Sequence, residues 1–169
     1  MMIIETKLII LRGNSGSGKT TIAKSLQEYF GEGTLLVSQD TVRREMLMVR
    51  DREENLSIDL IRQITEYGKG KCNVVILEGI FMKKRYQEML NQLIYFYNEN
   101  TCVCYFNLSF EETVVRHNSR PQAESFGKDS LRSWWIPKDH LGVEGEKILT
   151  GQMTKTDIVK LICSQVKKV

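Results

Sequence analysis

The segment Gly13-Asn14-Ser15-Gly16-Ser17-Gly18-Lys19-Thr20 fits the pattern G-x-x-x-x-G-K-[ST] at every position. An apolar run at residues 8–11 precedes it, and a stretch with helical spacing at residues 19–30 follows it. A strand on one side and a helix on the other are the context in which this pattern forms a phosphate-binding loop. We therefore predict that residues 13–20, together with Thr21, bind the phosphates of a nucleoside triphosphate.

The residue types of this loop suit phosphate chemistry. Its glycines allow a tight turn in which backbone N–H groups point at phosphate oxygens, and the helix that follows adds its positive end. Lys19 is expected to reach the β- and γ-phosphates, and the hydroxyl of Thr20 is expected to bind Mg²⁺. The predicted cofactors are ATP and Mg²⁺. A glycine-rich turn without a ligand is the alternative.

Further apolar runs recur along the chain, at residues 35–37, 74–77, 102–108 and 148–149. Stretches with helical spacing lie between them, which is typical of βαβ units and a doubly wound α/β sheet. The length of 169 residues, with 41% hydrophobic and 27% charged residues, suits one globular domain over residues 1–169. We predict a five-stranded, mainly parallel sheet flanked by helices, with a helical lid at about 116–140.

Composition excludes several classes of protein. The net charge of +3 is too small to indicate nucleic acid by itself. The four cysteines are scattered, so we expect buried reduced thiols rather than a metal or disulfide site. The sequence shows neither a signal peptide nor an apolar stretch of roughly 18 residues, and no membrane association is expected. These observations predict a cytoplasmic protein.

A carboxylate, Asp40, follows the second apolar run. We expect this strand to lie beside the first one, which would bring Asp40 near the phosphate loop. A kinase needs a group that accepts the proton of the acceptor hydroxyl, and a positioned Asp serves as such a base. The alternative is that Asp40 only caps a helix that starts at Thr41. Arg43 could hold an anionic group of the substrate or orient Asp40.

The segment Asp40-Thr41-Val42-Arg43 resembles the D-x-x-R element of polynucleotide-kinase-like P-loop phosphotransferases of the AAA type. This group includes the bacteriophage 5′-polynucleotide kinase, the zeta toxins and the chloramphenicol phosphotransferases. The resemblance implies the P-loop NTPase fold. It also implies that Asp40 is the general base and that Arg43 contacts the acceptor.

A second block, residues 107–120, resembles the strand, helix and lid entry of these kinases. In them, an R-x-x-x-R pair closes over the triphosphate, and Arg116 and Arg120 match that pair. The two arginines stand four residues apart, so we expect them on one helix face. Swung inward, they would neutralise charge on the transferred phosphoryl group. Solvated arginines on a surface helix are the alternative.

An acid, Glu78, ends the third apolar run. An acid at this place can hold the hydration shell of Mg²⁺, so Glu78 and Thr20 are the predicted metal-side residues. An ordinary carboxylate at a strand end is the alternative. Residues 151–157 correspond in position to the loop that borders adenine in related kinases.

We therefore predict an ATP-dependent kinase that phosphorylates a hydroxyl group of a small molecule. Lys19, Asp40, Arg116 and Arg120 are the predicted catalytic residues, and Asp40 and Arg43 are the predicted acceptor-side residues.

The alternative within enzymes is a polynucleotide 5′-hydroxyl or nucleoside kinase, and no concentrated basic track favours a nucleic acid. From another class, a regulatory ATPase without an acceptor is possible. A toxin acting on nucleotide sugars is suggested by the resemblance alone. The sequence does not indicate an oligomeric state.

Overall fold

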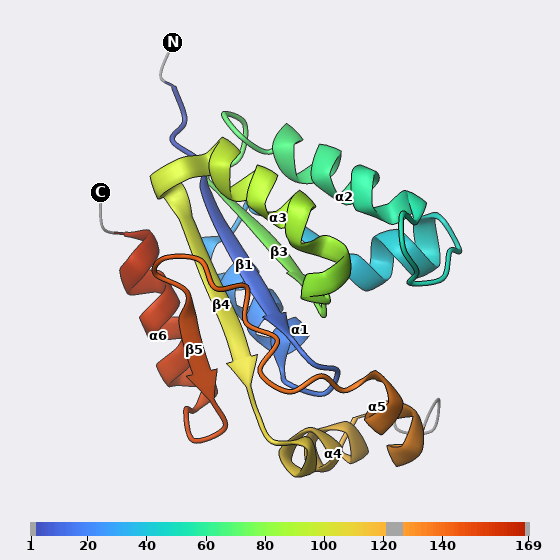
Figure 1. Ribbon diagram of the computed structural model, residues 1–169. Helices are drawn as coiled ribbons and strands as arrows, with labels where there is room; N and C mark the ends of the chain where they lie inside the picture. The colour runs from blue at the N-terminus through green and yellow to red at the C-terminus, as the bar shows by residue number, and fades with distance from the viewer. Residues whose placement is uncertain (1–2, 121–126, 168–169) are drawn as a thin grey trace.

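The computed structural model describes residues 3–120 and 127–167, and strands alternate with helices along this part of the chain (Figure 1). The described residues contain five strands, which coincide with the predicted apolar runs. They are β1 (Lys7–Gly13), β2 (Leu35–Ser38), β3 (Val74–Gly79), β4 (Thr101–Asn107) and β5 (Lys147–Thr150). The predicted α/β architecture is confirmed.

Helices connect the strands, and local sequence explains where several of them begin. They are α1 (Lys19–Phe30), the π-helical turn η1 (Thr41–Met46), α2 (Leu56–Tyr67), α3 (Lys83–Tyr97), the short η2 (Asn98–Asn100), α4 (Phe110–Asn118), α5 (Lys128–Trp134) and α6 (Lys155–Val166). Before α4, the hydroxyl of Ser109 accepts a hydrogen bond from the Glu112 backbone N–H. The Glu112 carboxylate accepts one from the Ser109 backbone N–H in return. This reciprocal pair satisfies backbone groups that the first turn of α4 leaves free.

The strand order is β2-β3-β1-β4-β5, and all four pairings are parallel. Ile9 in the middle of β1 is paired with Ile76 of β3 on one side and with Cys102 of β4 on the other. The prediction that β2 lies beside β1 is wrong, because β3 occupies that place. The chain leaves β1, runs through α1 and crosses one strand position before it returns as β2.

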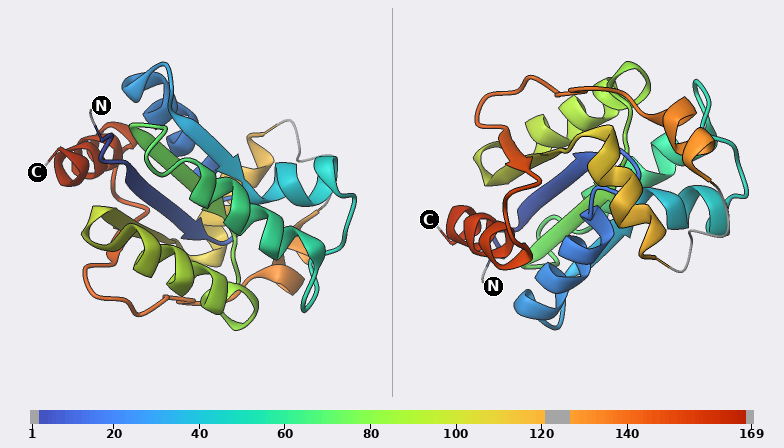
Figure 2. Two further views of the ribbon diagram at one scale, coloured as in Figure 1. Left: turned by 90° about the horizontal axis from the view of Figure 1, so that it is seen from above. Right: turned by 90° about the horizontal axis from the view of Figure 1, so that it is seen from below.

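Alternate residues of β1 face the two sides of the sheet, and both sides are covered. Leu8 and Ile10 belong to a core that includes residues of α2 and α3, whereas Ile9 and Leu11 belong to a core with α1 and α6. All four side chains are fully buried. Figure 2 shows the sheet between these two helical layers. Burial on both faces explains why the run at residues 8–11 is continuously apolar.

The carboxyl ends of the parallel strands meet at one edge of the sheet. There β1 leads into the phosphate loop, β2 is followed by Asp40, and β3 ends with Glu78 and Gly79. Figure 1 shows α4 and α5 beyond this same edge. The fold therefore gathers most of the predicted site residues at the place where open α/β sheets bind ligands.

All four cysteines are free thiols: Cys104 and Cys163 are buried, whereas Cys72 and Cys102 are only partly buried. The prediction of buried thiols is therefore correct for two of them and wrong for the other two.

Within the described residues, no helix combines the length and apolar character that a membrane crossing would need. The single domain over residues 1–169 stays a prediction.

Candidate active site

The loop between β1 and α1 turns around its glycines and packs against α4. Gly16 and Gly18 have φ angles of 82° and 98°, in the left-handed region that glycine enters without steric cost. A Cβ atom on Gly16 would lie 2.7 Å from the backbone oxygen of Thr113 in α4. Gly18 is also the N-cap of α1. The loop thus leads directly into the positive end of a helix, which is the geometry that binds phosphate.

Lys19 is almost fully buried, with 7% of its surface exposed, and its ammonium group lies back over the loop. Its Nζ atom donates hydrogen bonds to the backbone oxygen of Asn14 at 2.8 Å and to Oγ of Ser17 at 3.2 Å. Burial lowers the pKa of Lys19 to about 8, and the nearby carboxylates of Glu78 and Asp40 oppose this shift only in part. An anion in the loop would therefore favour the charged ammonium form.

Thr20 and Glu78 form the predicted metal-side pair. The Thr20 hydroxyl lies 3.4 Å from Oε1 of Glu78, and Glu78 is buried at the end of β3. Among the described residues, no group of three or more His, Cys, Asp or Glu side chains could hold a metal ion. Mg²⁺ commonly uses only one or two protein oxygens and completes its shell with water and phosphate. The hydroxyl and carboxylate oxygens of this pair fit such an ion.

Asp40 lies at the N-cap position of η1, and its side chain makes no capping hydrogen bond. The carboxylate is 65% exposed, accepts a hydrogen bond from Arg43 and forms an ion pair with Arg44. Its Oδ1 atom is 3.3 Å from Nη2 of Arg43 and 3.5 Å from Nε of Arg44. The helix-capping role that the sequence left open for Asp40 is therefore absent from the structure.

Arg43 and Arg44 differ in their surroundings although they are adjacent in the sequence. The Arg43 side chain is only 13% exposed, and its Nη1 atom donates to the backbone oxygen of Val49 at 3.1 Å. Arg44 is 55% exposed. Of the two roles considered for Arg43, the geometry favours orientation of Asp40. Arg44 was missed by the sequence analysis, and its only signal was its place beside the D-x-x-R element.

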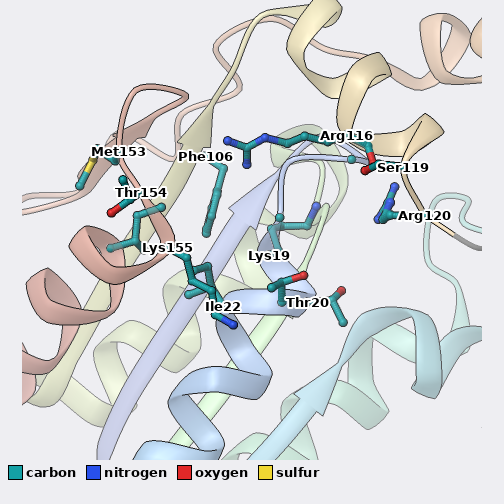
Figure 3. A pocket seen from close by; sticks show the side chains of 14 residues that line it. Lys19, Thr20, Ile22, Phe106, Arg116, Ser119, Arg120, Met153, Thr154 and Lys155 are labelled. Atoms are coloured by element: carbon teal, nitrogen blue, oxygen red, sulfur yellow. The ribbon is translucent and has the colours of Figure 1, made fainter.

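The two arginines of the predicted lid do not share one helix face. Helix α4 ends at Asn118, so Arg116 lies within it and Arg120 lies beyond it. Nη1 of Arg116 donates to the backbone oxygen of Ser17 in the phosphate loop at 2.9 Å. Nη2 of Arg120 lies 3.3 Å from Nδ1 of His117. Figure 3 shows Arg116 above Lys19 and Arg120 to the right of it, with their guanidinium groups apart.

A pocket of about 390 Å³ lies between the phosphate loop, α4 and the start of α6 (Figure 3). Four of its lining residues are basic: Lys19, Arg116, Arg120 and Lys155. Four others are apolar: Ile22, Phe106, Met153 and Ile158. Thr21 also lines it, and no carboxylate does so among the described residues. The pocket suits a ligand with a strongly anionic end and an apolar end. Residues 153–155 line it, and the adenine-bordering role of residues 151–157 stays a prediction.

Arg12 at the end of β1 and Asn14 in the phosphate loop are not among the residues that line this pocket. Both polar side-chain atoms of Asn14 are hydrogen-bonded to the backbone of Ile136. Arg12 is fully buried and binds Phe81 and Asp139. The sequence analysis assigned Asn14 to the nucleotide and overlooked Arg12. A charged residue directly after a buried apolar run was the signal that could have identified Arg12.

Residues 8–132 match a family model described as an AAA domain. The matched stretch contains the phosphate loop, Asp40, Glu78 and both arginines of the predicted lid. The chain belongs to this AAA-domain family. Its resemblance to the P-loop phosphotransferase group is confirmed at the level of family and fold. A comparison with characterised protein sequences finds no significant match.

Solved structures share the fold of this AAA-domain protein. The APS kinase of Mycobacterium tuberculosis, solved with AMPPNP and APS, superposes with a TM-score of 0.70 at 11% identity, over 96% of this chain and 98% of that one. A gluconokinase from Sinorhizobium meliloti 1021 gives 0.67 at 14% identity, over 95% and 91%. A chain from an RNA repair complex gives 0.52 at 24% identity, over 76% of this chain and 42% of that one. At these identities the likeness shows the fold alone.

Proposed function

We propose that this protein is an ATP-dependent kinase that transfers the γ-phosphoryl group to a hydroxyl of a small molecule. The observation that carries the proposal is the convergence of three side chains from separate elements. Glu78, at the end of β3, lies 3.4 Å from the hydroxyl of Thr20, the residue after Lys19, and Asp40 follows β2 at the same edge of the sheet. Both carboxylates raise the pKa of Lys19 against the effect of burial. A phosphate-binding lysine, an acid for the metal and a candidate base thus lie at the same edge of the sheet.

Each residue of the site has a role in nucleotide binding under this proposal. The backbone N–H groups of residues 13–20 and the ammonium of Lys19 hold the β- and γ-phosphates. Thr20 and Glu78 would hold Mg²⁺, which supplies charge neutralisation on those phosphate oxygens when it is bound. The basic pocket wall, including Arg116 and Arg120, balances the remaining phosphate charge. The apolar wall receives the base.

The transfer step needs a proton acceptor, and Asp40 serves as one. As the acceptor oxygen bonds to the γ-phosphorus, its proton passes to the carboxylate of Asp40. The bond between the γ-phosphorus and the bridging oxygen breaks, and ADP leaves with that oxygen. Arg43, held by the backbone oxygen of Val49, keeps the carboxylate in place. The exposed carboxylate is accessible to an acceptor that approaches from solvent.

Two neighbours in structure support a compact acceptor, because they are a gluconokinase and an APS kinase. The RNA repair complex among the neighbours favours the second candidate, a polynucleotide 5′-hydroxyl or nucleoside kinase. A regulatory ATPase without an acceptor is the third. We also propose a cytoplasmic location, which the free cysteines support.

Transfer of label from γ-labelled ATP to a panel of acceptors tests the proposal. The panel contains sugar acids, sugars, adenosine phosphosulfate, nucleosides and an oligonucleotide with a free 5′-hydroxyl. We expect one small-molecule class to accept label. Asp40→Asn should lower that transfer by about 10²-fold or more, because it removes the general base. AMPPNP affinity should not change, since Asp40 lies on the acceptor side.

Asp59→Asn is the matched control, because Asp59 is also an exposed acid paired with an arginine, on α2. It should leave transfer unchanged. Full transfer by Asp40→Asn would refute the assignment of the base. Label in the oligonucleotide alone would establish the second candidate, and ATP hydrolysis with no labelled acceptor would establish the third.

A further inference from the structure

Asn14, the second residue of the phosphate loop, is hydrogen-bonded to a residue far along the chain. Its Nδ2 atom donates to the backbone oxygen of Ile136 at 2.6 Å, and its Oδ1 atom accepts from the backbone N–H of Ile136 at 2.9 Å. Asn14 is 6% exposed. The side-chain amide therefore uses both a donor and its acceptor on the backbone of one residue.

The segment that contains Ile136 is held at a second point. Arg12 donates to the backbone oxygen of Asp139 at 2.8 Å and to its carboxylate at 3.2 Å. The backbone N–H of Asp139 donates to the Tyr105 hydroxyl at 3.0 Å, and the carboxylate also accepts from the backbone N–H of Lys83. We name residues 135–139 the exit segment, because they follow α5 at the end of the predicted lid. β1, β4 and α3 all anchor it.

The exit segment also contacts α4. The ring of Trp135 lies edge-on to Phe110 with 5.9 Å between centroids, and the guanidinium of Arg132 in α5 lies 4.3 Å from the centre of the same ring. A shift of the exit segment would therefore disturb the packing of α5 on α4, the helix that carries Arg116.

The backbone of Asn14 connects this contact to Lys19. Its carbonyl oxygen accepts the hydrogen bond from Lys19 at 2.8 Å. If Lys19 turns to a bound phosphate, as the proposed function requires, this carbonyl keeps only the hydrogen bond from the Ser17 backbone N–H at 3.3 Å. Asn14 thus hydrogen-bonds to Lys19 through its backbone oxygen and to Ile136 of the exit segment through its side-chain amide.

We propose that Asn14 is a positioning residue that couples the phosphate loop to the exit segment, rather than a nucleotide ligand. Its side chain holds the exit segment against the loop, and binding of a nucleotide tightens this contact. The nucleotide-dependent part rests on the proposed function. The contact itself is present in the structure and does not rest on the proposed function.

Amide hydrogen exchange followed by NMR tests both parts, because the Ile136 N–H is one of the bonded groups. Without nucleotide, Asn14→Ala should speed exchange at Ile136 by about tenfold, the effect of losing one such hydrogen bond. Exchange at Asp139 should not change, since Tyr105 still holds that N–H. With Mg²⁺ and AMPPNP, exchange at Ile136 should slow in the unmutated protein and stay unaffected in the variant.

Asn118→Ala, at the exposed end of α4, is the control of the same residue type and should behave as the unmutated protein. Tryptophan emission gives a second readout, because Trp135 directly precedes Ile136 and Trp134 precedes Trp135. Asn14→Ala should abolish the change that AMPPNP causes.

If the exchange rate of the Ile136 N–H is the same in Asn14→Ala as in the unmutated protein, both without nucleotide, the contact between Asn14 and Ile136 is refuted. Loss of AMPPNP binding together with normal Ile136 exchange would show that Asn14 is a ligand and would also overturn the proposal. If the unmutated protein binds no AMPPNP, the proposed function and the coupling fail, while the comparison without nucleotide still decides the contact.

Discussion

Lys19 should lower the stability of the free protein, and the structure indicates by how much. Burial moves its pKa from 10.5 to about 8. Each unit of such a shift corresponds to about 1.4 kcal/mol, so holding this ammonium in the folded protein costs about 3 kcal/mol at neutral pH. Replacement by methionine removes this charge. It also removes the hydrogen bonds to Asn14 and Ser17, so the pH dependence, not the absolute difference, isolates the titration.

The sign of that dependence follows from the two pKa values. Between pH 8 and pH 10.5 the unfolded chain holds a proton on Lys19 that the folded protein has lost. Stability therefore rises with pH across this window. We expect the unmutated protein to gain about 2 to 3 kcal/mol relative to Lys19→Met between pH 7 and pH 10. The difference should be nearly constant below pH 7.

Urea unfolding of both proteins without nucleotide, at intervals from pH 6 to pH 10, measures this difference. Groups that titrate in both proteins cancel in the comparison. Lys24→Met is the matched control, because Lys24 lies on the same helix and is exposed to solvent. Its difference from the unmutated protein should not vary with pH. If the difference in the free energy of unfolding between Lys19→Met and the unmutated protein does not change from pH 6 to pH 10, the reasoning is refuted.

Two other substitutions test the buried polar groups around the site. Arg12→Met should lower the free energy of unfolding in urea by about 3 to 5 kcal/mol, because it leaves the carboxylate of Asp139 and the backbone oxygen of Phe81 without their buried partner. A loss below about 1 kcal/mol, as is typical of surface ion pairs, would contradict this. Glu78→Gln should raise the Mg²⁺ concentration needed for half-maximal AMPPNP binding by about 10- to 100-fold, a range known for groups around metal sites. An unchanged Mg²⁺ requirement would show that Glu78 is only a strand-end carboxylate.

The phosphate loop could be predicted because its information is local. Eight consecutive residues specify the turn, and the apolar run before them and the helical spacing after them specify the flanking elements. The capping pair Ser109 and Glu112 is local in the same sense, since it defines where α4 begins. Asp40 and Glu78 could be placed at strand ends for the same reason, although their roles stay proposals.

The order of the strands could not be predicted in this way. The apolar character of β1, β2 and β3 indicates burial on both faces, but it does not state which strand is the neighbour of which. Pairing depends on how the connecting helices cross the sheet, and here β3 separates β2 from β1. Asp40 consequently lies two strands away from the phosphate loop, with the end of β3 between them.

The sequence by itself determined the α/β class, the phosphate loop and the strand ends that contain the candidate acids, because these depend on neighbouring residues and on short periods. Only the tertiary structure decided the contacts between distant residues. Asn14 and Ile136 are 122 positions apart. Arg12 is buried against Asp139 rather than solvated. Such pairs form because a buried polar group must find a hydrogen-bonding partner wherever the fold provides one, and no local pattern specifies that partner.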